Sequence, residues 1–261
     1  MSDAYTNVRY TVTGTTAWIE FARPPINAFN RVMVEEVRDA IAAAIADPAI
    51  RVCVLASANE RYFSAGADLA AFRGIGAEGM RRWVGLCHDI ARRIRTSPKP
   101  FLAAIHGTAV GGGLEMTLHC DIRFCATDAK LGQPEVRIGF IPPIATTQVL
   151  ARMIGRSRAI RYLYDGRTVT AQEALDWGLV DELAEPAALR GRVQAYADEL
   201  AAQSPTALAA IRRTVTVGGG MSFEEGMALE LEIATELAAS PDFDEGIEAF
   251  LAKRKPVWSK A

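Results

Sequence analysis

Three short segments that are almost wholly apolar constrain the fold of this chain more than any other feature. They cover residues 51–56, 101–105 and 122–125. A strand with apolar side chains on both faces has to be buried on both faces, which is typical of parallel sheets covered by helices. Helical spacing of apolar residues separates these segments, first from Val34 to a stop at Asp47-Pro48 and again over 78–95. Buried strands that alternate with helices predict an α/β domain.

The two ends of the chain show different patterns. Residues 8–13 and 18–21 are predicted as two short strands joined across Gly14. From about residue 186 onward we expect only helices. Residues of the kind that cap helix starts occur at Thr170, Ser204, Ser222 and Ser240. The expected organisation is therefore an α/β core over 1–185 followed by a helical region over 186–261.

Charge and composition exclude several classes of protein. Lys and Arg number 29 against 31 Asp and Glu, so the chain has no basic footprint and no nucleic acid partner is expected. No apolar run approaches the ~18 residues that a membrane span needs. Residues 1–5 lack the basic and apolar regions of a signal peptide. All four cysteines lie in apolar stretches, which favours buried thiols in a reducing compartment and a cytoplasmic protein.

The first of three unusual stretches covers residues 63–69, with the sequence FSAGADL. It follows the buried strand that ends at Ala56, and its small residues let the backbone approach a ligand closely. The alternative is an ordinary turn between a strand and a helix, with Asp68 as the cap. Composition alone leaves the binding loop and the structural turn both open.

The second stretch covers residues 106–115, with the sequence HGTAVGGGLE. Successive glycines beside a helix start leave bare backbone amides, which can bind an anion or a developing oxyanion. A flexible linker is the alternative, but the apolar residues on both sides argue against it. The stretch lacks the Gly-Lys-Ser/Thr and G-x-G-x-x-G patterns of two common phosphate sites.

Two glutamates stand beside these loops. Glu115 lies just inside the helix start, and Glu135 ends the third stretch, LGQPE, over 131–135. Each one alone is typical of a surface carboxylate or a charge at a helix start. As a pair beside an oxyanion-type loop they predict a general acid and base.

Taken in this order, the three stretches resemble the motifs of the crotonase, or enoyl-CoA hydratase/isomerase, family. These motifs are F-x-A-G-A-D-L, G-G-G-x-E and G-Q-P-E. The likeness extends to residues 23–28, 170–180 and 250–255, so that it covers nearly the whole chain. The resemblance implies a spiral core of ββα turns and a C-terminal helical region that assembles a homo-trimer or a dimer of trimers.

The resemblance also implies a function and a set of site residues. The substrate would be an acyl-CoA thioester, with coenzyme A as part of the substrate and no separate cofactor. The backbone amides of Ala67 and Gly112 would hold the thioester oxygen, and Glu115 and Glu135 would be catalytic. The residues expected to contact the substrate or its CoA arm are Ile26, Ala65, Asp68, Leu69 and Pro143.

One segment departs from the family pattern. A typical hydratase of the family continues after G-Q-P-E with I-P-G-A-G-G-T-Q, whereas residues 141–148 here are IPPIATTQ. Pro143 has no amide proton to offer to a water molecule. Ile144 and Thr146 are larger than the residues they replace, so we expect a reshaped acyl pocket that takes a branched or cyclic enoyl group.

Other polar residues are expected to have ordinary roles. His88, His106 and His119 show no spacing typical of a metal site, and no metal is expected. A solvated helix face is the favoured interpretation for Arg152, Arg156, Arg158 and Arg161, with CoA phosphates as the alternative. Lys253 and Lys255 are equally compatible with a helix end and with the CoA of a neighbouring subunit.

Three functions are weighed on these grounds. The first is enoyl-CoA hydratase activity on the 2,3 double bond, in fatty-acid or related acyl-CoA metabolism, with Glu115 positioning the water and Glu135 delivering the proton. The two roles can also be reversed or shared. The second is isomerisation of an enoyl-CoA double bond, which needs only one carboxylate. The third is a catalytically silent binding subunit.

Overall fold

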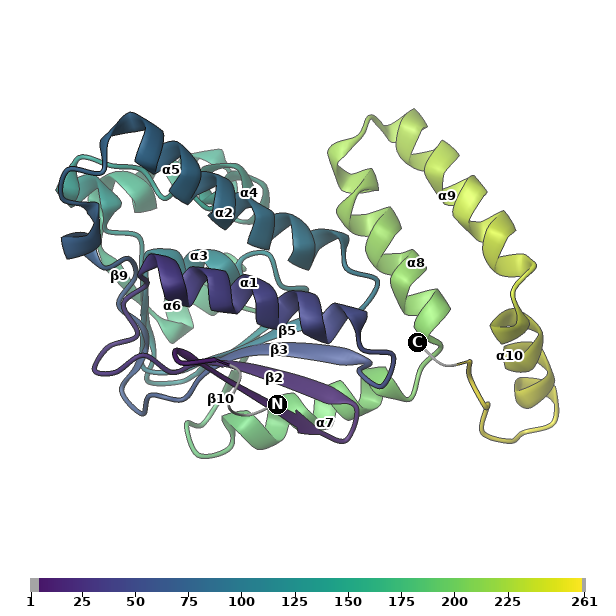
Figure 1. The fold of residues 1–261 in the computed structure, drawn as a ribbon. Helices are drawn as coiled ribbons and strands as arrows, with labels where there is room; N and C mark the ends of the chain where they lie inside the picture. Colours follow the sequence, from purple (N-terminus) through teal and green to yellow (C-terminus); the bar gives the residue numbers. More distant parts are fainter. Residues whose placement is uncertain (1–4, 260–261) are drawn as a thin grey trace.

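The computed structural model describes residues 5–259, in which strands and helices alternate as predicted (Figure 1). Part of the stretch on which the signal-peptide prediction depends, residues 1–4, lies outside the described residues. The larger sheet has the strand order β1-β2-β3-β5-β7-β10, with the bounds β1 (Val8–Thr13), β2 (Thr16–Phe21), β3 (Val52–Ser57), β5 (Phe101–Ile105), β7 (Ile122–Ala126) and β10 (Glu182–Ala184). The three apolar segments thus form three neighbouring strands, which confirms their prediction as buried strands.

All neighbours in this sheet are parallel except β1 and β2, which form an antiparallel pair. A second, smaller sheet has the order β4-β6-β8-β9, with the bounds β4 (Tyr62–Ser64), β6 (Thr108–Val110), β8 (Lys130–Gly132) and β9 (Thr168–Thr170). In this sheet β4, β6 and β8 are parallel, and β9 is antiparallel to β8.

The two sheets arise from a repeated ββα turn. In each turn the first strand joins the larger sheet, the second joins the smaller sheet, and a helix follows. The three turns are β3-β4-α2, β5-β6-α3 and β7-β8-α4, with the helix bounds α2 (Gly76–Thr96), α3 (Gly112–Thr117) and α4 (Thr146–Met153). Short 3₁₀ helices, η1 (Leu69–Phe72) and η2 (Glu135–Ile138), follow β4 and β8. This arrangement confirms the predicted spiral of ββα turns.

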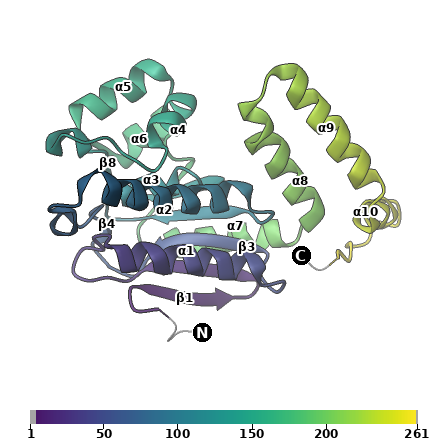
Figure 2. The same cartoon turned by 45° about the horizontal axis from the view of Figure 1, so that its top comes forward.

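Helices cover the larger sheet on both faces. Helix α1 (Arg31–Ala46) lies over one face beside α2, and α7 (Leu189–Ala201) lies under the other (Figures 1 and 2). Helix α1 begins three residues before the predicted Val34 because the side chain of Asn30 accepts a hydrogen bond from the amide of Met33 at 2.9 Å. Two further helices, α5 (Arg156–Asp165) and α6 (Ala171–Trp177), lie on the side of the smaller sheet.

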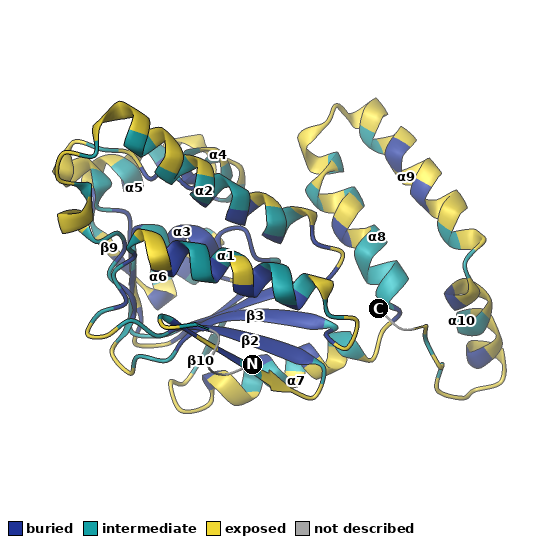
Figure 3. Cartoon of the chain, viewed as in Figure 1, coloured by how far each residue is buried: buried dark blue, intermediate teal, exposed yellow. Residues whose placement is uncertain are grey.

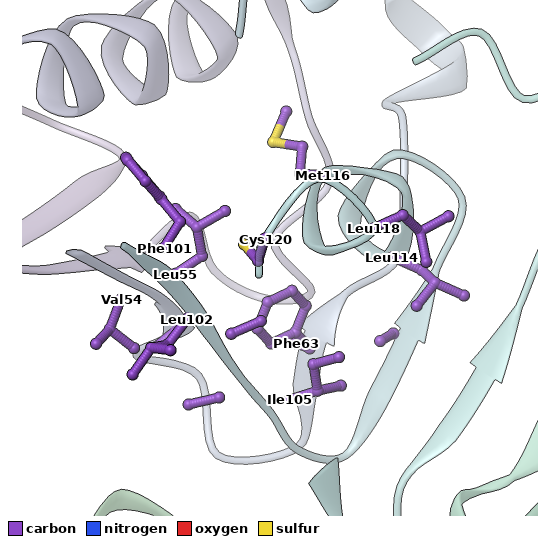
Figure 4. Packing of buried hydrophobic residues seen from close by; sticks show 14 of the residues in the cluster. Val54, Leu55, Phe63, Phe101, Leu102, Ile105, Leu114, Met116, Leu118 and Cys120 are labelled. Carbon is purple, nitrogen blue, oxygen red and sulfur yellow. The ribbon is translucent and has the colours of Figure 1, made fainter. Parts of the chain in front are cut away.

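The core between these layers is apolar and closely packed. The ring of Phe63 is fully buried among side chains of β5 and of the α3 segment (Figure 4). All four cysteines, Cys53, Cys87, Cys120 and Cys125, are buried and free, as their apolar surroundings predicted. Burial raises the pKa of each thiol, so these cysteines act as small apolar residues.

The helical C-terminal region divides into two parts. Leu189, Val193 and Ala197 of α7 belong to the core of the main body. The remaining helices form an arm that projects from the body: α8 (Pro205–Thr216), η3 (Gly218–Gly220), α9 (Phe223–Ala238) and α10 (Pro241–Leu251) (Figure 1). The predicted caps Ser204, Ser222 and Ser240 open α8, α9 and α10, respectively. The domain boundary between residues 185 and 186 stays a prediction.

The surface of this arm is largely exposed (Figure 3). It is tied to the body through Arg212, which pairs with Asp121 at 2.7 Å and also donates to the carbonyls of Ser97 and Ile94. Among residues 5–259, none of the helices combines the length and the apolar character needed to cross a membrane.

Candidate active site

Three neighbouring parallel strands deliver the predicted site residues to one edge of the smaller sheet. The chain leaves β4 into the loop with Ala67, leaves β6 into Gly112, and leaves β8 into Glu135. The carboxyl ends of parallel strands are the usual position for a ligand in such sheets. Glu115 joins them from α3, where it lies three residues after Gly112 and therefore on the same helix face.

The two predicted oxyanion donors come from loops that touch. A Cβ atom added to Gly66 would lie 3.4 Å from the Cα of Gly111 and 3.6 Å from the amide nitrogen of Gly112. Within the described part of the chain, neither Ala67 nor Gly112 donates a backbone hydrogen bond. Both residues line one cavity. Two free amides at one cavity are the arrangement that stabilises a carbonyl oxygen as negative charge develops on it.

The glycine run is required by this close packing. Gly111 has φ 52° and ψ −136°, a backbone conformation open only to glycine, and an added Cβ would lie 2.8 Å from Oε1 of Glu135. A Cβ on Gly113 would clash with the side chain of Ser64. The flexible-linker interpretation is therefore wrong, because the run is packed on both sides.

The cavity has a volume of about 200 Å³ and brings most of the predicted site together. Its lining includes Ala65, Ala67, Leu69, Gly112, Glu115, Glu135 and Pro143. Much of the remaining lining is aromatic or aliphatic, from Phe29, Phe72, Trp83, Met116, Ile138 and Phe140. The rings of Phe72 and Trp83 meet edge to face, with centroids 4.9 Å apart. Such a wall suits an apolar acyl group.

Two predicted contact residues do not line this cavity. The carbonyl of Ile26 accepts a hydrogen bond from the amide of Ala65 at 3.0 Å, which fixes the position of the loop. Asp68 pairs with Arg23 at 3.1 Å and caps η1 by accepting from the amide of Ala70. The structural role considered for Asp68 is thus confirmed, and contact of Ile26 or Asp68 with CoA stays a prediction.

Glu115 is almost fully buried, and one of its oxygens is held twice. Its Oε2 accepts hydrogen bonds from the amide of Ile144 at 2.8 Å and from the hydroxyl of Thr146 at 2.7 Å. Burial and, next, the charge of Glu135 raise the pKa of Glu115 to about 8, although these two hydrogen bonds act in the opposite direction. Oε1 makes no hydrogen bond to any described residue and is the oxygen left for substrate or water.

Glu135 has a much poorer set of partners. Its Oε2 is buried and has no hydrogen-bond partner among the described residues. The side-chain amide of Gln133 and the hydroxyl of Tyr162 are also buried without a hydrogen-bond partner there. Burial raises the pKa of Glu135 to about 7, and the charge of Glu135 is one reason why the pKa of Tyr162 is raised as well. Because two negative charges at one cavity repel each other, Glu115 and Glu135 together favour binding one proton near neutral pH.

Sequence reasoning did not identify the partners of Glu115. Thr146 and Ile144 were noted only as bulky replacements, yet both supply donors to the carboxylate of Glu115. A threonine in place of a small residue does signal a new hydroxyl, but the fold is needed to bring it across 31 positions of sequence to Glu115.

The other candidate residues have structural contacts. His88, His106 and His119 each form a hydrogen bond with a backbone carbonyl. No group of three potential metal ligands occurs within residues 5–259. The side chains considered for CoA phosphates are exposed, namely Arg152, Arg156, Arg158, Arg161, Lys253 and Lys255. Their contact with CoA stays a prediction.

Comparison with known proteins agrees with this geometry. The family model described as enoyl-CoA hydratase/isomerase matches residues 11–261. A probable enoyl-CoA hydratase of Bacillus subtilis is 38% identical over 235 residues, which cover 89% of this chain and 91% of that protein. A crotonyl-CoA hydratase of Syntrophomonas wolfei is 32% identical over 253 residues, covering 97% of each chain.

Solved structures give the same result for the fold. The crystal structure of an enoyl-CoA hydratase from Geobacillus kaustophilus superposes with a TM-score of 0.93 at 34% identity, over 97% of this chain and 96% of that one. The class defined by the spiral fold and the paired carboxyl groups is that of the crotonase-fold acyl-CoA enzymes. This chain belongs to the enoyl-CoA hydratase/isomerase family.

Proposed function

We propose that this protein is an enoyl-CoA hydratase that adds water across the 2,3 double bond of a 2-enoyl-CoA to give a 3-hydroxyacyl-CoA. The observation that carries the proposal is the placement of two carboxyl groups with raised pKa values, Glu115 and Glu135, at the cavity that also holds two free amides. Among residues 5–259, neither carboxyl group has a basic partner that would fix its charge, so near neutral pH each can take up or release a proton.

The proposed reaction begins at the thioester carbonyl. Its oxygen accepts hydrogen bonds from the amides of Ala67 and Gly112, which lowers the energy of the enolate that forms when water attacks the third carbon. Oε1 of Glu115 orients the water and takes its proton, and the protonated carboxyl group of Glu135 gives a proton to the second carbon. One O–H bond of water and the π bond of the alkene are broken, and one carbon–oxygen and one carbon–hydrogen bond are formed. Transfer of the proton from Glu115 back to Glu135 restores the enzyme, so the sum is the addition of one water molecule. No cofactor besides the CoA of the substrate takes part.

The acyl group of the substrate follows from the lining of the cavity. Phe29, Phe72, Trp83 and Phe140 present rings, and Pro143 and Ile144 replace smaller residues of the family pattern. We propose a branched or cyclic enoyl group, because a broad apolar wall offers more contact to such groups than to a short straight chain.

The assembly and setting of the enzyme are part of the proposal. Phe223, Leu231 and Phe250 of the arm are 79%, 71% and 83% exposed, respectively, which is a large apolar surface for a single chain. We propose that residues 186–261 build a homo-trimer or a dimer of trimers. We further propose a cytoplasmic enzyme of fatty-acid oxidation or related acyl-CoA metabolism, with no nucleic acid partner.

Isomerisation of the double bond is the second candidate. It uses one carboxyl group to move a proton and needs no bound water. The two hydrogen bonds on Oε2 of Glu115 and the second carboxyl group, Glu135, at the same cavity support the hydratase, because an isomerase needs only one carboxyl group. The same two carboxyl groups argue against a catalytically silent subunit, which needs neither of them.

The test assays a panel of straight, branched and cyclic 2-enoyl-CoAs. The reaction is monitored through the decrease in absorbance of the conjugated thioester, and it is run in water labelled with heavy oxygen. A hydratase places the label on the third carbon of the product. An isomerase moves the double bond without taking up the label, and Glu135→Gln should then leave much of its activity. If no panel member is hydrated or isomerised, both enzyme assignments are wrong and the silent subunit is favoured.

A further inference from the structure

We infer that His88 and His119 are positioning residues for Glu115, and that they act through the backbone of Pro143 and Ile144. The inference rests on the proposed function, since it assigns a role in the same site. His88 belongs to α2, whereas His119 follows α3, so two separate parts of the chain converge on one short segment. Both imidazoles lie outside the catalytic cavity and line a neighbouring groove.

Each imidazole binds one of two consecutive carbonyl groups. Nε2 of His88 lies 2.8 Å from the carbonyl oxygen of Pro143, and Nε2 of His119 lies 2.7 Å from that of Ile144. A carbonyl oxygen only accepts, so both rings donate from Nε2 and carry their proton there. Because the partner of each ring is a carbonyl oxygen, both rings must be hydrogen-bond donors.

The link to Glu115 runs through a single peptide group. The carbonyl of Pro143 and the amide of Ile144 belong to the same planar unit, in which the C=O and N–H bonds have a fixed relative direction. His88 holds the carbonyl at one end, and the amide at the other end donates to Oε2 of Glu115 at 2.8 Å. Any rotation of this peptide that breaks the first hydrogen bond also turns the second away from the carboxyl group.

The segment has few other means of support. Residues 139–145 form no helix or strand, and Pro142 and Pro143 have no amide proton to donate. Ala145, the next residue, has φ 52°, a left-handed conformation that persists only where the surroundings impose it. The carbonyl of the preceding residue, Ile144, accepts the hydrogen bond from His119, so this second imidazole stabilises the turn that leads into α4.

The imidazole of His119 is suited to this task because it stays neutral. Burial is the main cause that lowers the pKa of His119 to about 4, and the positive charge of Arg95 adds to it, although the hydrogen bond to the carbonyl of Ile144 acts in the opposite direction. A neutral donor fixes the carbonyl without bringing a positive charge near Glu115, where such a charge would lower the raised pKa of the carboxyl group. The charged side chains around the two rings are those of Arg92, Arg95, Asp121, Arg123, Arg152 and Arg212.

The experiment compares variants that keep or remove the donor. His88→Leu and His119→Leu remove it while filling the space, whereas His88→Gln and His119→Gln keep an N–H at a similar reach. His106→Leu is the matched control, since Nε2 of His106 binds the carbonyl of Asn59 and the ring does not line the cavity. Each protein is assayed for kcat, KM and thermal stability. The pKa of Glu115 is measured by carbon NMR of labelled glutamate carboxyl groups, assigned with Glu115→Gln.

The leucine variants should lower kcat about tenfold with KM changed less than about twofold, as expected when the hydrogen bond from the amide of Ile144 to Glu115 is weakened. They should also raise the pKa of Glu115, because the amide of Ile144 holds that pKa down. The glutamine variants should recover most of the activity, and His106→Leu should change stability alone.

Two results would overturn the inference. One is a pKa of Glu115 that is unchanged in both leucine variants. The other is a loss of activity that only follows the loss of stability, as in the His106 control. Because the NMR titration needs no substrate, a wild-type protein without hydratase activity contradicts the proposed function and leaves the positioning role to be decided by the titration.

Discussion

Glu115 and Glu135 face one cavity from two regions of the molecule, and these regions hold a carboxyl group in different ways. On the α3–α4 side, Oε2 of Glu115 accepts two hydrogen bonds, from Ile144 and Thr146. On the η2 side, Oε2 of Glu135 is buried without a partner among the described residues. Burial raises the pKa of both groups, and they differ both in hydrogen-bond support and in burial, since Glu115 is almost fully buried and Glu135 is only partly buried.

This difference suggests a division of labour. A carboxylate that orients water benefits from a fixed direction, because a well-placed nucleophile avoids the entropy of searching for its position. A carboxyl group that delivers a proton to carbon makes a new contact only in the transition state, and an unpaired oxygen is free to do so. This difference supports the roles in the proposed mechanism, with Glu115 as the residue that positions water and Glu135 as the acid.

The largest expected effect comes from removing either carboxyl group. Glu115→Gln and Glu135→Gln should each lower kcat for hydration by about 10³-fold, within the range known for general acid–base groups. The double variant should be little worse than either single variant, since the two act as one unit. Steady-state rates on the best panel substrate measure this, with circular dichroism as the control for folding. A single variant that keeps more than about a tenth of the wild-type rate contradicts the two-carboxylate mechanism.

A smaller effect is expected from disturbing Glu135 through the adjoining glycine loop. Gly111→Ala forces a Cβ against Oε1 of Glu135 and strains the backbone at φ 52°, so kcat should fall about 10²-fold, as for other small displacements of catalytic groups. The matched control is Gly178→Ala, at φ 75° with open space around the added Cβ. The control should lose about 1 kcal/mol of stability and no activity. Equal losses of activity in both variants would show that backbone strain, and not Glu135, is responsible.

The support of Glu115 can be weakened one bond at a time. Thr146→Val removes the hydroxyl that donates to Oε2 and should lower kcat about tenfold, whereas Thr146→Ser keeps the donor and should stay near the wild-type rate. The hydrogen bond lowers the pKa of Glu115, so its loss should move the corresponding limb of the pH–rate profile to higher pH. A profile that does not move would mean that Glu115 does not control that limb.

The smallest effect concerns stability as a function of pH. Because the folded chain raises the pKa of Glu115 from 4.5 to about 8, this group stabilises the fold most below about pH 4.5 and progressively less as the pH rises to about 8. Glu115→Gln should therefore melt a few degrees above the wild type at pH 9, and this advantage should vanish near pH 4. Thermal melts across this range test the sign. A variant that is less stable than the wild type at high pH would mean that the buried charge is better compensated than its two hydrogen bonds indicate.

Much of the fold could be predicted because local sequence and tertiary structure agree. Buried strands are apolar on both faces, and Ser204, Ser222 and Ser240 cap the helices that they were expected to open. The packing of α7 against the body, apart from the other C-terminal helices, was not predicted, because the apolar positions of α7 resemble those of α8 in sequence. Only the fold decides that Val193 meets the sheet whereas Ile211 stays 59% exposed.

The site was predicted in part for a related reason. Glu115, Glu135, Ala67 and Gly112 stand in short ordered motifs, and the structure brings all four to one cavity. The partners of Glu115 could not be predicted, because Ile144 lies in a loop and Thr146 begins α4 directly after it, in a segment that departs from the family pattern. Contacts of that kind depend on how the loop packs and not on any local spacing of residues.

The parallel pairing of β4, β6 and β8 has a consequence for how the protein is made. Parallel neighbours cannot be joined by a tight turn. Strand β4, which precedes Ala67, therefore pairs with β6, which precedes Gly112, only after α2 and β5 have been synthesised between them. A ribosome that has reached the end of β5 has produced one of the two amides and neither carboxyl group. A nascent or truncated chain of that length should therefore neither bind nor turn over an enoyl thioester.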